Sequence, residues 1–172
     1  MAEDEATPIL VTDASVLINF LRIEQLDILC GYPAAILITR HVADEISEFY
    51  PSQRALFEQA LADNLIQIIP PTTDAENDLF SELMGDGRLG IGECSAIAHA
   101  ITHGCALAMD DRRANARASE LRPEILLLGT HDIVVHAIRR GELTVHAADD
   151  IKAVWAENHR FRLRFNSFAD IV

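Results

Sequence analysis

The chain has 172 residues, of which 49% are apolar, enough for one domain with a sizeable core. Aromatic residues make up only 6%, so aliphatic side chains must fill that core. This composition argues against a disordered chain, and no stretch reaches the roughly 18 apolar residues of a membrane span. The first five residues are acidic rather than basic, unlike a signal peptide. We therefore expect a soluble, cytoplasmic protein with no membrane partner.

The net charge of −13 argues against a nucleic-acid partner, because phosphate binding usually requires a basic surface. That argument fails if part of the acid is gathered in a metal site, since a bound cation reverses the local field. The cysteines, Cys30, Cys94 and Cys105, are odd in number and lack C-x-x-C spacing. They indicate neither a disulfide framework nor a cysteine zinc site.

Short aliphatic runs predict strands, and the segments between them predict helices. In chain order, we expect a strand at 9–12, a helix at 14–30, a strand at 35–38, a helix at 40–63 broken at Pro51, a strand at 65–69, helices at 74–84 and 90–103, a strand at 105–109, a helix at 111–121, a strand at 125–128 and a helix at 131–140. The strands are almost continuously apolar, as in parallel sheets covered on both faces. The pattern predicts an α/β fold, a three-layer α/β/α sandwich with a central, mostly parallel five-stranded sheet.

The domain organisation expected from this pattern is simple. Residues 1–7 are expected to form a disordered acidic tail. Residues 8–172 are expected to form a single domain with a C-terminal extension from about residue 141.

Acidic residues follow two of the predicted strands. Asp13 comes directly after the first strand, and Asp110 and Asp111 follow the fourth. In doubly wound sheets the functional crevice lies beyond the carboxyl ends of the strands, so these carboxylates are candidates for a common site. Asp13 and Asp111 each have an alternative, purely structural role, because either side chain could cap the helix that follows it.

Two helical acids are also predicted to face inward. In 40–49 the buried face is expected to contain Val42, Ile46 and Phe49, with Glu45 at its edge. Glu93 falls in the middle of an apolar arc in the helix at 90–103, where a carboxylate is costly to bury without compensation. Glu93 also has a simpler explanation. It lies near the start of its helix, where the helix dipole favours acidic residues. Several carboxylates that share a pocket repel one another, and a divalent cation relieves that repulsion.

Taken in order, these motifs resemble the PIN-domain family. The segments that carry the resemblance are Val-Thr-Asp-Ala-Ser-Val at 11–16, Val-Ala-Asp-Glu-Ile at 42–46, Gly-Ile-Gly-Glu-Cys-Ser at 90–95, Met-Asp-Asp-Arg-Arg at 109–113 and Leu-Gly-Thr at 128–130. Within that family, the chain resembles the nucleases related to VapC toxins of toxin–antitoxin pairs. No single motif is specific, but the ordered set spans roughly residues 9–140.

The resemblance implies an Mg²⁺- or Mn²⁺-dependent endoribonuclease. Its acidic site would comprise Asp13, Glu45, Glu93 and one or both of Asp110 and Asp111, and all of these except Glu45 are expected to be metal ligands. Ser15 would support the site through a hydrogen bond. Met109 stands where many relatives carry a small hydroxyl residue. The implied partners are an RNA substrate, a cognate antitoxin and a second copy of the chain in a homodimer.

Other acid-rich α/β families fit less well. A haloacid-dehalogenase-like phosphatase needs Asp-x-Asp after the first strand, where this chain has Ser15. A response-regulator receiver needs a lysine after its last strand, and the only lysine, Lys152, lies far beyond it. A catalytically idle PIN-like protein that only binds a partner or RNA stays open.

Two further patterns have both a functional and a structural interpretation. His99 and His103 have the spacing of zinc ligands, but they fall on the polar side of their helix and are expected at the surface. Arg160, Arg162 and Arg164 alternate with apolar residues, so an extended segment would place them on one face. They could contact RNA phosphates together with Arg112 and Arg113, or they could protect an edge strand from aggregation.

Overall fold

The structure is a computed structural model that describes residues 8–172, so the predicted tail at 1–7 lies outside the described residues. Its centre is one sheet in the strand order β3-β2-β1-β4-β5. The strands are β1 (Ile9–Thr12), β2 (Ala35–Thr39), β3 (Ile66–Ile69), β4 (Ala106–Ala108) and β5 (Leu127–Leu128). Each pairing between neighbours in this sheet is parallel, which confirms the predicted fold class.

Helices connect the strands and follow the last one. They are α1 (Ala14–Arg22), α2 (Leu26–Cys30), α3 (Arg40–Phe49), α4 (Arg54–Ala62), α5 (Asp74–Asp86), α6 (Ile91–His103), α7 (Arg112–Leu121), α8 (Thr130–Arg139) and α9 (Val145–Asn158), with a short 3₁₀ turn at Phe168–Asp170. The helix expected at 14–30 is divided, because Glu24 adopts a left-handed conformation with φ 57°. Across residues 8–172, no helix is both long and apolar enough to span a membrane.

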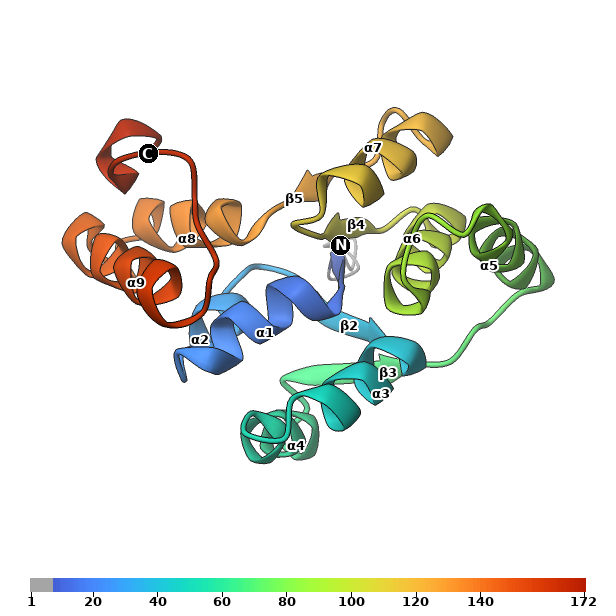
Figure 1. Cartoon of the computed structure of the whole chain (residues 1–172), viewed down its shortest axis with the longest axis horizontal. Helices are drawn as coiled ribbons and strands as arrows, with labels where there is room; N and C mark the ends of the chain where they lie inside the picture. The colour runs from blue at the N-terminus through green and yellow to red at the C-terminus, as the bar shows by residue number, and fades with distance from the viewer. Residues whose placement is uncertain (1–7) are drawn as a thin grey trace, which may run out of the picture.

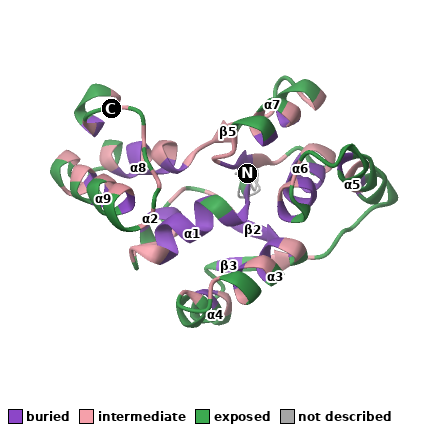
Figure 2. Ribbon diagram, in the orientation of Figure 1, coloured by how far each residue is buried: buried purple, intermediate pink, exposed green. Residues whose placement is uncertain are grey.

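Two clusters of buried apolar side chains form the core. Figure 2 shows where buried residues lie along the ribbon. Leu10 belongs to a cluster with α1, α2, α8 and α9, whereas its neighbour Val11 belongs to a cluster with α5, α6 and α7. Consecutive strand residues point to opposite faces, so these clusters form on opposite sides (Figure 1). Phe49, expected on a buried face, is 66% exposed because it stands at the last turn of α3.

The residues after 141 contribute to the first of these clusters. Trp155 of α9 is fully buried and packs edge-on against Phe20 and Phe161, with ring centroids 5.8 and 5.5 Å apart. Its Nε1 donates a hydrogen bond to the carbonyl of Asn19 in α1 at 2.8 Å. These contacts fix α9 against α1, and the chain beyond α9 returns toward α8 (Figure 1).

Candidate active site

Asp13 stands at the junction of β1 and α1. Its backbone N–H donates to the carbonyl of Ala108 at 3.1 Å, which extends the contact between β1 and β4 by one residue. Its carboxylate caps α1 by accepting from Val16 N at 3.2 Å, and Ser15 Oγ lies 2.9 Å from both carboxylate oxygens. The residue is only 3% exposed. Asp13 is therefore both a helix cap and a buried acid at the end of a central strand.

The environment of Asp13 disfavours its charged form. Burial raises the pKa of Asp13 to about 7, against the opposing effect of the hydrogen bonds from Val16 and Ser15. The nearby charges of Asp110 and Glu93 raise this pKa further. At neutral pH, Asp13 is a group whose ionisation a neighbouring cation would strongly favour.

The side chains of Asp110 and Asp111 make different contacts. Asp110 accepts hydrogen bonds from the backbone N–H and the hydroxyl of Thr130, at 2.8 and 2.6 Å, and from Asn19 Nδ2 at 3.0 Å. Burial raises the pKa of Asp110 in spite of these bonds. Asp111 instead caps α7, accepting from the backbone N–H groups of residues 113 and 114. Of the two, it is Asp110 that acts on Asp13 as a like charge.

Glu45 of α3 lies against the start of α6, the helix that carries Glu93. A Cβ atom on Gly92 would come within 2.7 Å of Glu45 Oε2, so the glycine permits this close approach. Burial raises the pKa of Glu45, and the charge of Glu93 raises it further. Glu93 Oε2 also accepts from the backbone N–H of Gly90 at 2.9 Å, which helps to cap α6.

Electrostatic repulsion thus links four of the predicted carboxylates: the charge of Glu93 acts on Glu45 and on Asp13, and the charge of Asp110 acts on Asp13. We call Glu45, Glu93, Asp13 and Asp110 the acidic row. Its donors are carboxylate oxygens, the ligand type that Mg²⁺ and Mn²⁺ take. A divalent cation would offset their burial and their mutual repulsion, so the donor chemistry of these residues fits such an ion. In the described structure no three of their ligand atoms lie within 4.8 Å of one another, so the carboxylates would have to move closer to hold it together.

Sequence reasoning missed two residues that hold the Asp110 carboxylate in place. Asn19 and Thr130 are buried, they hydrogen-bond to each other at 3.1 Å, and both donate to Asp110. A signal for each was present in the sequence. Asn19 interrupts the apolar run at 16–21, and Thr130 directly follows the last strand and its glycine.

Thr130→Val tests this support. It removes the hydroxyl bond but keeps the backbone bond to Asp110, so the pKa of Asp110 should rise further and protons should compete better with a metal. We expect Mn²⁺ affinity about tenfold weaker, with a larger loss at pH 6 than at pH 8. Calorimetric titration at the two pH values measures the Mn²⁺ affinity of the variant and of the wild type. Thr130→Ser, which retains the hydroxyl, should restore binding, and an equal loss in the serine variant would contradict this role.

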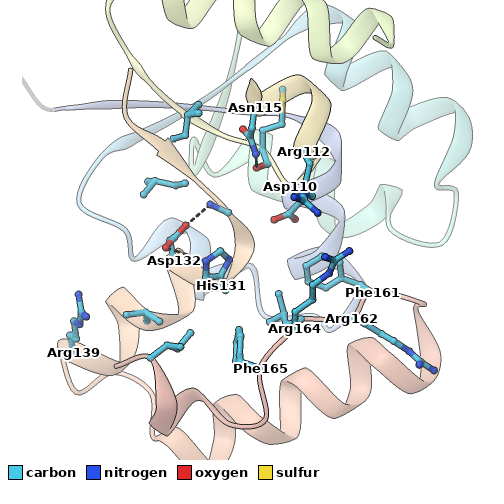
Figure 3. A pocket seen from close by; sticks show the side chains of 17 residues that line it. Asp110, Arg112, Asn115, His131, Asp132, Arg139, Phe161, Arg162, Arg164 and Phe165 are labelled. Atoms are coloured by element: carbon cyan, nitrogen blue, oxygen red, sulfur yellow. Dashed lines mark hydrogen bonds and ion pairs between the residues drawn. The ribbon is translucent and has the colours of Figure 1, made fainter. Parts of the chain in front are cut away.

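A groove of about 680 Å³ opens beside Asp110 (Figure 3). Residues of α8 and of the C-terminal segment line it, and its charged side chains include Arg112, Arg139, Arg162 and Arg164. Arg113 and Arg160 are not among the lining residues. Arg162 and Arg164, two of the arginines predicted after residue 159, therefore line the same groove as Asp110, although they are distant from it in sequence.

The segment at 159–165 is not the strand that its alternation suggested. Arg160 has a left-handed φ of 56°, which turns the chain after α9, and the following residues form no ladder. The alternation of apolar residues and arginines still determines which side chains of this segment are buried. Phe161, Leu163 and Phe165 pack against the first core cluster, and the intervening arginines are exposed. Protection of an edge strand therefore does not explain these arginines.

The surface position expected for His99 was wrong. His99 is only 6% exposed and its Nδ1 lies 2.9 Å from Oε1 of the buried Glu76. His103 is at the surface, as expected. The helical wheel correctly placed His99 away from Glu93, but it could not show that α5 covers this side of α6.

Comparison with known proteins shows the following. No curated protein matches the chain by sequence. Among solved structures, it is similar to VapBC2 from Rickettsia felis bound to a DNA fragment from its promoter, with 17% identity, a TM-score of 0.50 and coverage of 70% of this chain and 98% of that one. It is also similar to PAE2754 from Pyrobaculum aerophilum, with 15% identity, a TM-score of 0.53 and coverage of 77% and 90%. FitAcB from Neisseria gonorrhoeae matches with 13% identity, a TM-score of 0.48 and coverage of 71% and 98%.

At these identities the structural matches support the fold. The sequence itself matches a family model described as PIN domain over residues 9–169. Because that match spans nearly the whole chain and includes every member of the acidic row, the chain belongs to the PIN-domain family.

Proposed function

We propose that the chain is an Mg²⁺- or Mn²⁺-dependent endoribonuclease that hydrolyses RNA phosphodiester bonds at the acidic row. PIN domains are generally nucleases, which supports the reaction class. The observation that carries the proposal is Asp13, a carboxylate 3% exposed at a strand end, with the charges of Asp110 and Glu93 nearby. A protein gains little stability from such an arrangement unless a cation binds there.

The chain's own groups have distinct tasks in this proposal. A divalent cation bound by the carboxylates would supply an activated water and stabilise the leaving oxygen. Asp13, Glu93 and Asp110 would hold this cation, and Ser15, Asn19 and Thr130 orient two of these carboxylates through hydrogen bonds. Glu45, half-buried at the margin of the row with a raised pKa, is suited to accept a proton from the attacking water.

The groove beside Asp110 is the proposed path of the RNA. Arg112, Arg162 and Arg164 line it and place positive charge next to the acidic row. In a chain with a net charge of −13, such local positive charge is needed to hold a polyanion near the site.

Cleavage of labelled RNA by purified protein tests the function. We expect cleavage in Mn²⁺, none in chelator, and a rate lowered by at least about 100-fold in Glu93→Gln, which removes one charge and keeps the side-chain shape. Glu48→Gln, at an exposed position of α3, is the control and should cleave like the wild type. A wild type that binds RNA but does not cut it in Mn²⁺ would favour the idle binding module instead.

We also propose that the chain is the toxin of a toxin–antitoxin pair and forms a homodimer. An active ribonuclease harms its own cell, so an inhibitor that inserts a basic side chain into the acidic row would complement the site. The similar Rickettsia felis structure is of VapBC2 on its promoter DNA, which is consistent with such a partner. Co-purification from the native operon tests the pairing, and an active enzyme that elutes alone at every concentration counts against it.

A further inference from the structure

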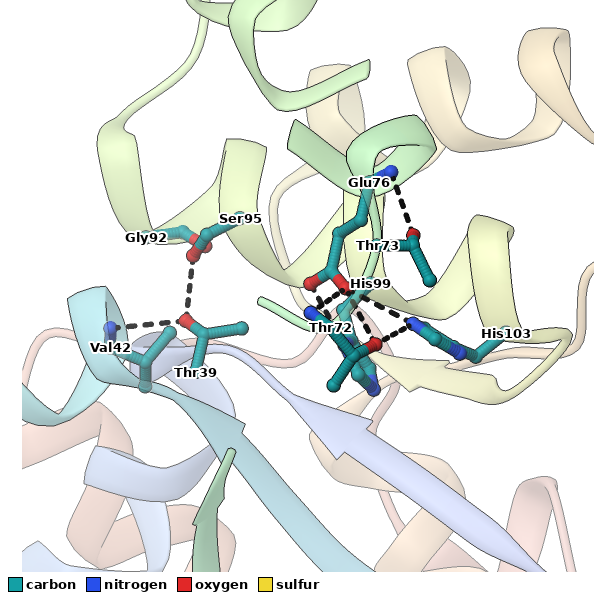
Figure 4. Close-up of polar contacts among 9 residues, drawn as sticks. All are labelled: Thr39, Val42, Thr72, Thr73, Glu76, Gly92, Ser95, His99 and His103. Atoms are coloured by element: carbon teal, nitrogen blue, oxygen red, sulfur yellow. Dashed lines mark hydrogen bonds and ion pairs between the residues drawn. The ribbon is translucent and has the colours of Figure 1, made fainter. Parts of the chain in front are cut away.

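A second cluster of metal-binding side-chain types lies where α5 meets α6 (Figure 4). Glu76 comes from the first turn of α5, and His99 and His103 stand four residues apart on α6, so both rings lie on one face of that helix. Nδ1 of His99 is 2.9 Å from Glu76 Oε1, and Nε2 of His103 is 3.0 Å from Glu76 Oε2. One ligand atom from each residue lies within 4.8 Å of the other two.

The cluster is largely shielded from solvent. Glu76 is 4% exposed and His99 is 6% exposed, whereas the His103 side chain is 29% exposed. Burial alone would raise the pKa of Glu76, but hydrogen bonds from Thr72, His99 and His103 outweigh it and hold that pKa below its usual range. At neutral pH the cluster therefore presents an ionised carboxylate to two imidazole rings.

Capping of α5 explains only part of these contacts. Glu76 Oε2 accepts from the backbone N–H of Thr72 at 3.1 Å, a contact that supports the start of the helix. The Thr72 hydroxyl also lies 2.8 Å from His103 Nε2. Capping does not require the second oxygen, Oε1, nor does it require His99 to turn its Nδ1 toward that oxygen inside the protein.

We infer that Glu76, His99 and His103 form a binding site for a divalent cation of the Zn²⁺ type, separate from the acidic row. Two imidazole nitrogens and one carboxylate oxygen are a zinc donor set, whereas Mg²⁺ prefers oxygen ligands alone. Zinc bonds of about 2.0–2.1 Å place tetrahedral ligand atoms roughly 3.3 Å apart. One ligand atom from each residue already lies within 4.8 Å of the other two, so small side-chain movements are enough to bring all three to this spacing.

Each ring becomes a ligand without a large rearrangement. The nitrogen that faces Glu76 presents its lone pair when the imidazole carries its proton on the other ring nitrogen. Partial exposure of His103 gives an ion, and a water as fourth ligand, access from solvent. The bound ion would join α5 to the C-terminal half of α6, and Glu93 lies in the first turn of that helix.

Metal binding to the full chain tests this site directly. After dialysis against chelator, and with Mg²⁺ in excess to occupy oxygen-ligand sites, we expect one Zn²⁺ per chain in equilibrium dialysis. Co²⁺ in place of Zn²⁺ should give the intense visible absorption of a four-coordinate ion. His103→Gln should weaken Zn²⁺ binding by at least about tenfold, since even loss of a ligand's supporting partner has that effect.

Two control variants distinguish Zn²⁺ binding at this site from Zn²⁺ binding elsewhere on the chain. His146→Gln, at a histidine whose side chain is 90% exposed, should leave Zn²⁺ binding unchanged. Asp13→Asn should also retain it, so the result does not depend on the proposed nuclease. The inference is overturned if the wild type binds no stoichiometric Zn²⁺, if its Co²⁺ spectrum is that of a six-coordinate ion, or if a folded His103→Gln binds as tightly as the wild type.

Discussion

Asp13→Asn is expected to be more stable than the wild type at pH 8 in chelator, by about 2 kcal/mol, while losing its response to Mn²⁺. Because the pKa of Asp13 is raised to about 7 in the folded chain, the folded state keeps a proton that the unfolded state releases. Stability of the metal-free wild type should therefore fall as the pH rises from about 4 to about 7. The shift corresponds to about 4 kcal/mol, and weaker hydrogen bonds to the amide reduce the gain.

Thermal melts at pH 5, 6 and 8, in chelator and in Mn²⁺, measure this effect. The difference between variant and wild type in chelator should grow with pH, because the loss of stability caused by ionisation of Asp13 occurs in the wild type alone. Mn²⁺ should stabilise the wild type more at higher pH, where fewer protons compete for the carboxylates. Asp44→Asn, at an exposed position of α3, is the control. If Mn²⁺ stabilised the wild type and Asp13→Asn equally, Asp13 would not be part of the metal site.

The double variant Arg162→Gln/Arg164→Gln is expected to bind RNA more weakly and with a smaller dependence on salt. Both side chains line the groove beside Asp110. If each contacts one phosphate of a single strand, the slope of log affinity against log salt should fall by about 1.4. Affinity at low salt should fall roughly tenfold or more. Fluorescence anisotropy with labelled RNA at several salt concentrations measures both quantities.

Arg160→Gln provides the matched control for the arginine pair. Arg160 belongs to the same segment and carries the same charge, but it does not line the groove. It should leave the salt slope unchanged. A loss in Arg160→Gln equal, per charge removed, to that in the double variant would indicate a diffuse charge effect rather than contacts within the groove.

The sheet and the acidic row were predictable from the sequence because each depends on local patterns. Short aliphatic runs define buried parallel strands, and the acid after β1 must lie near the acid after β4, since these strands are neighbours. The helical wheel identified Glu93 because its carboxylate interrupts an apolar arc. Which of Asp110 and Asp111 faces the site was not predictable from the sequence. Either side chain could cap α7, and the path of the turn after β4 determines which of them does so.

The features that sequence reasoning missed depend on contacts between distant segments. The partner of His99 is Glu76, which lies in another helix, and packing of α5 against α6 turns an expected surface histidine into a buried one. Asn19 and Thr130 meet only because α1 and α8 converge on Asp110. The C-terminal arginines reach the groove because Arg160 turns the chain after α9, a conformation that alternation alone does not reveal.

Cleavage of labelled RNA in saturating Mn²⁺ by Asp110→Asn and Asp111→Asn tests the central claim most directly. The two variants make the same chemical change at adjacent positions, and asparagine caps a helix as well as aspartate does, so α7 should persist in both. Asp110→Asn should lose at least about 100-fold in rate, because a metal-holding carboxylate is removed, and Asp111→Asn should cleave like the wild type. An Asp110→Asn variant that cleaves as fast as the wild type, in a preparation free of contaminating nuclease, would contradict the account.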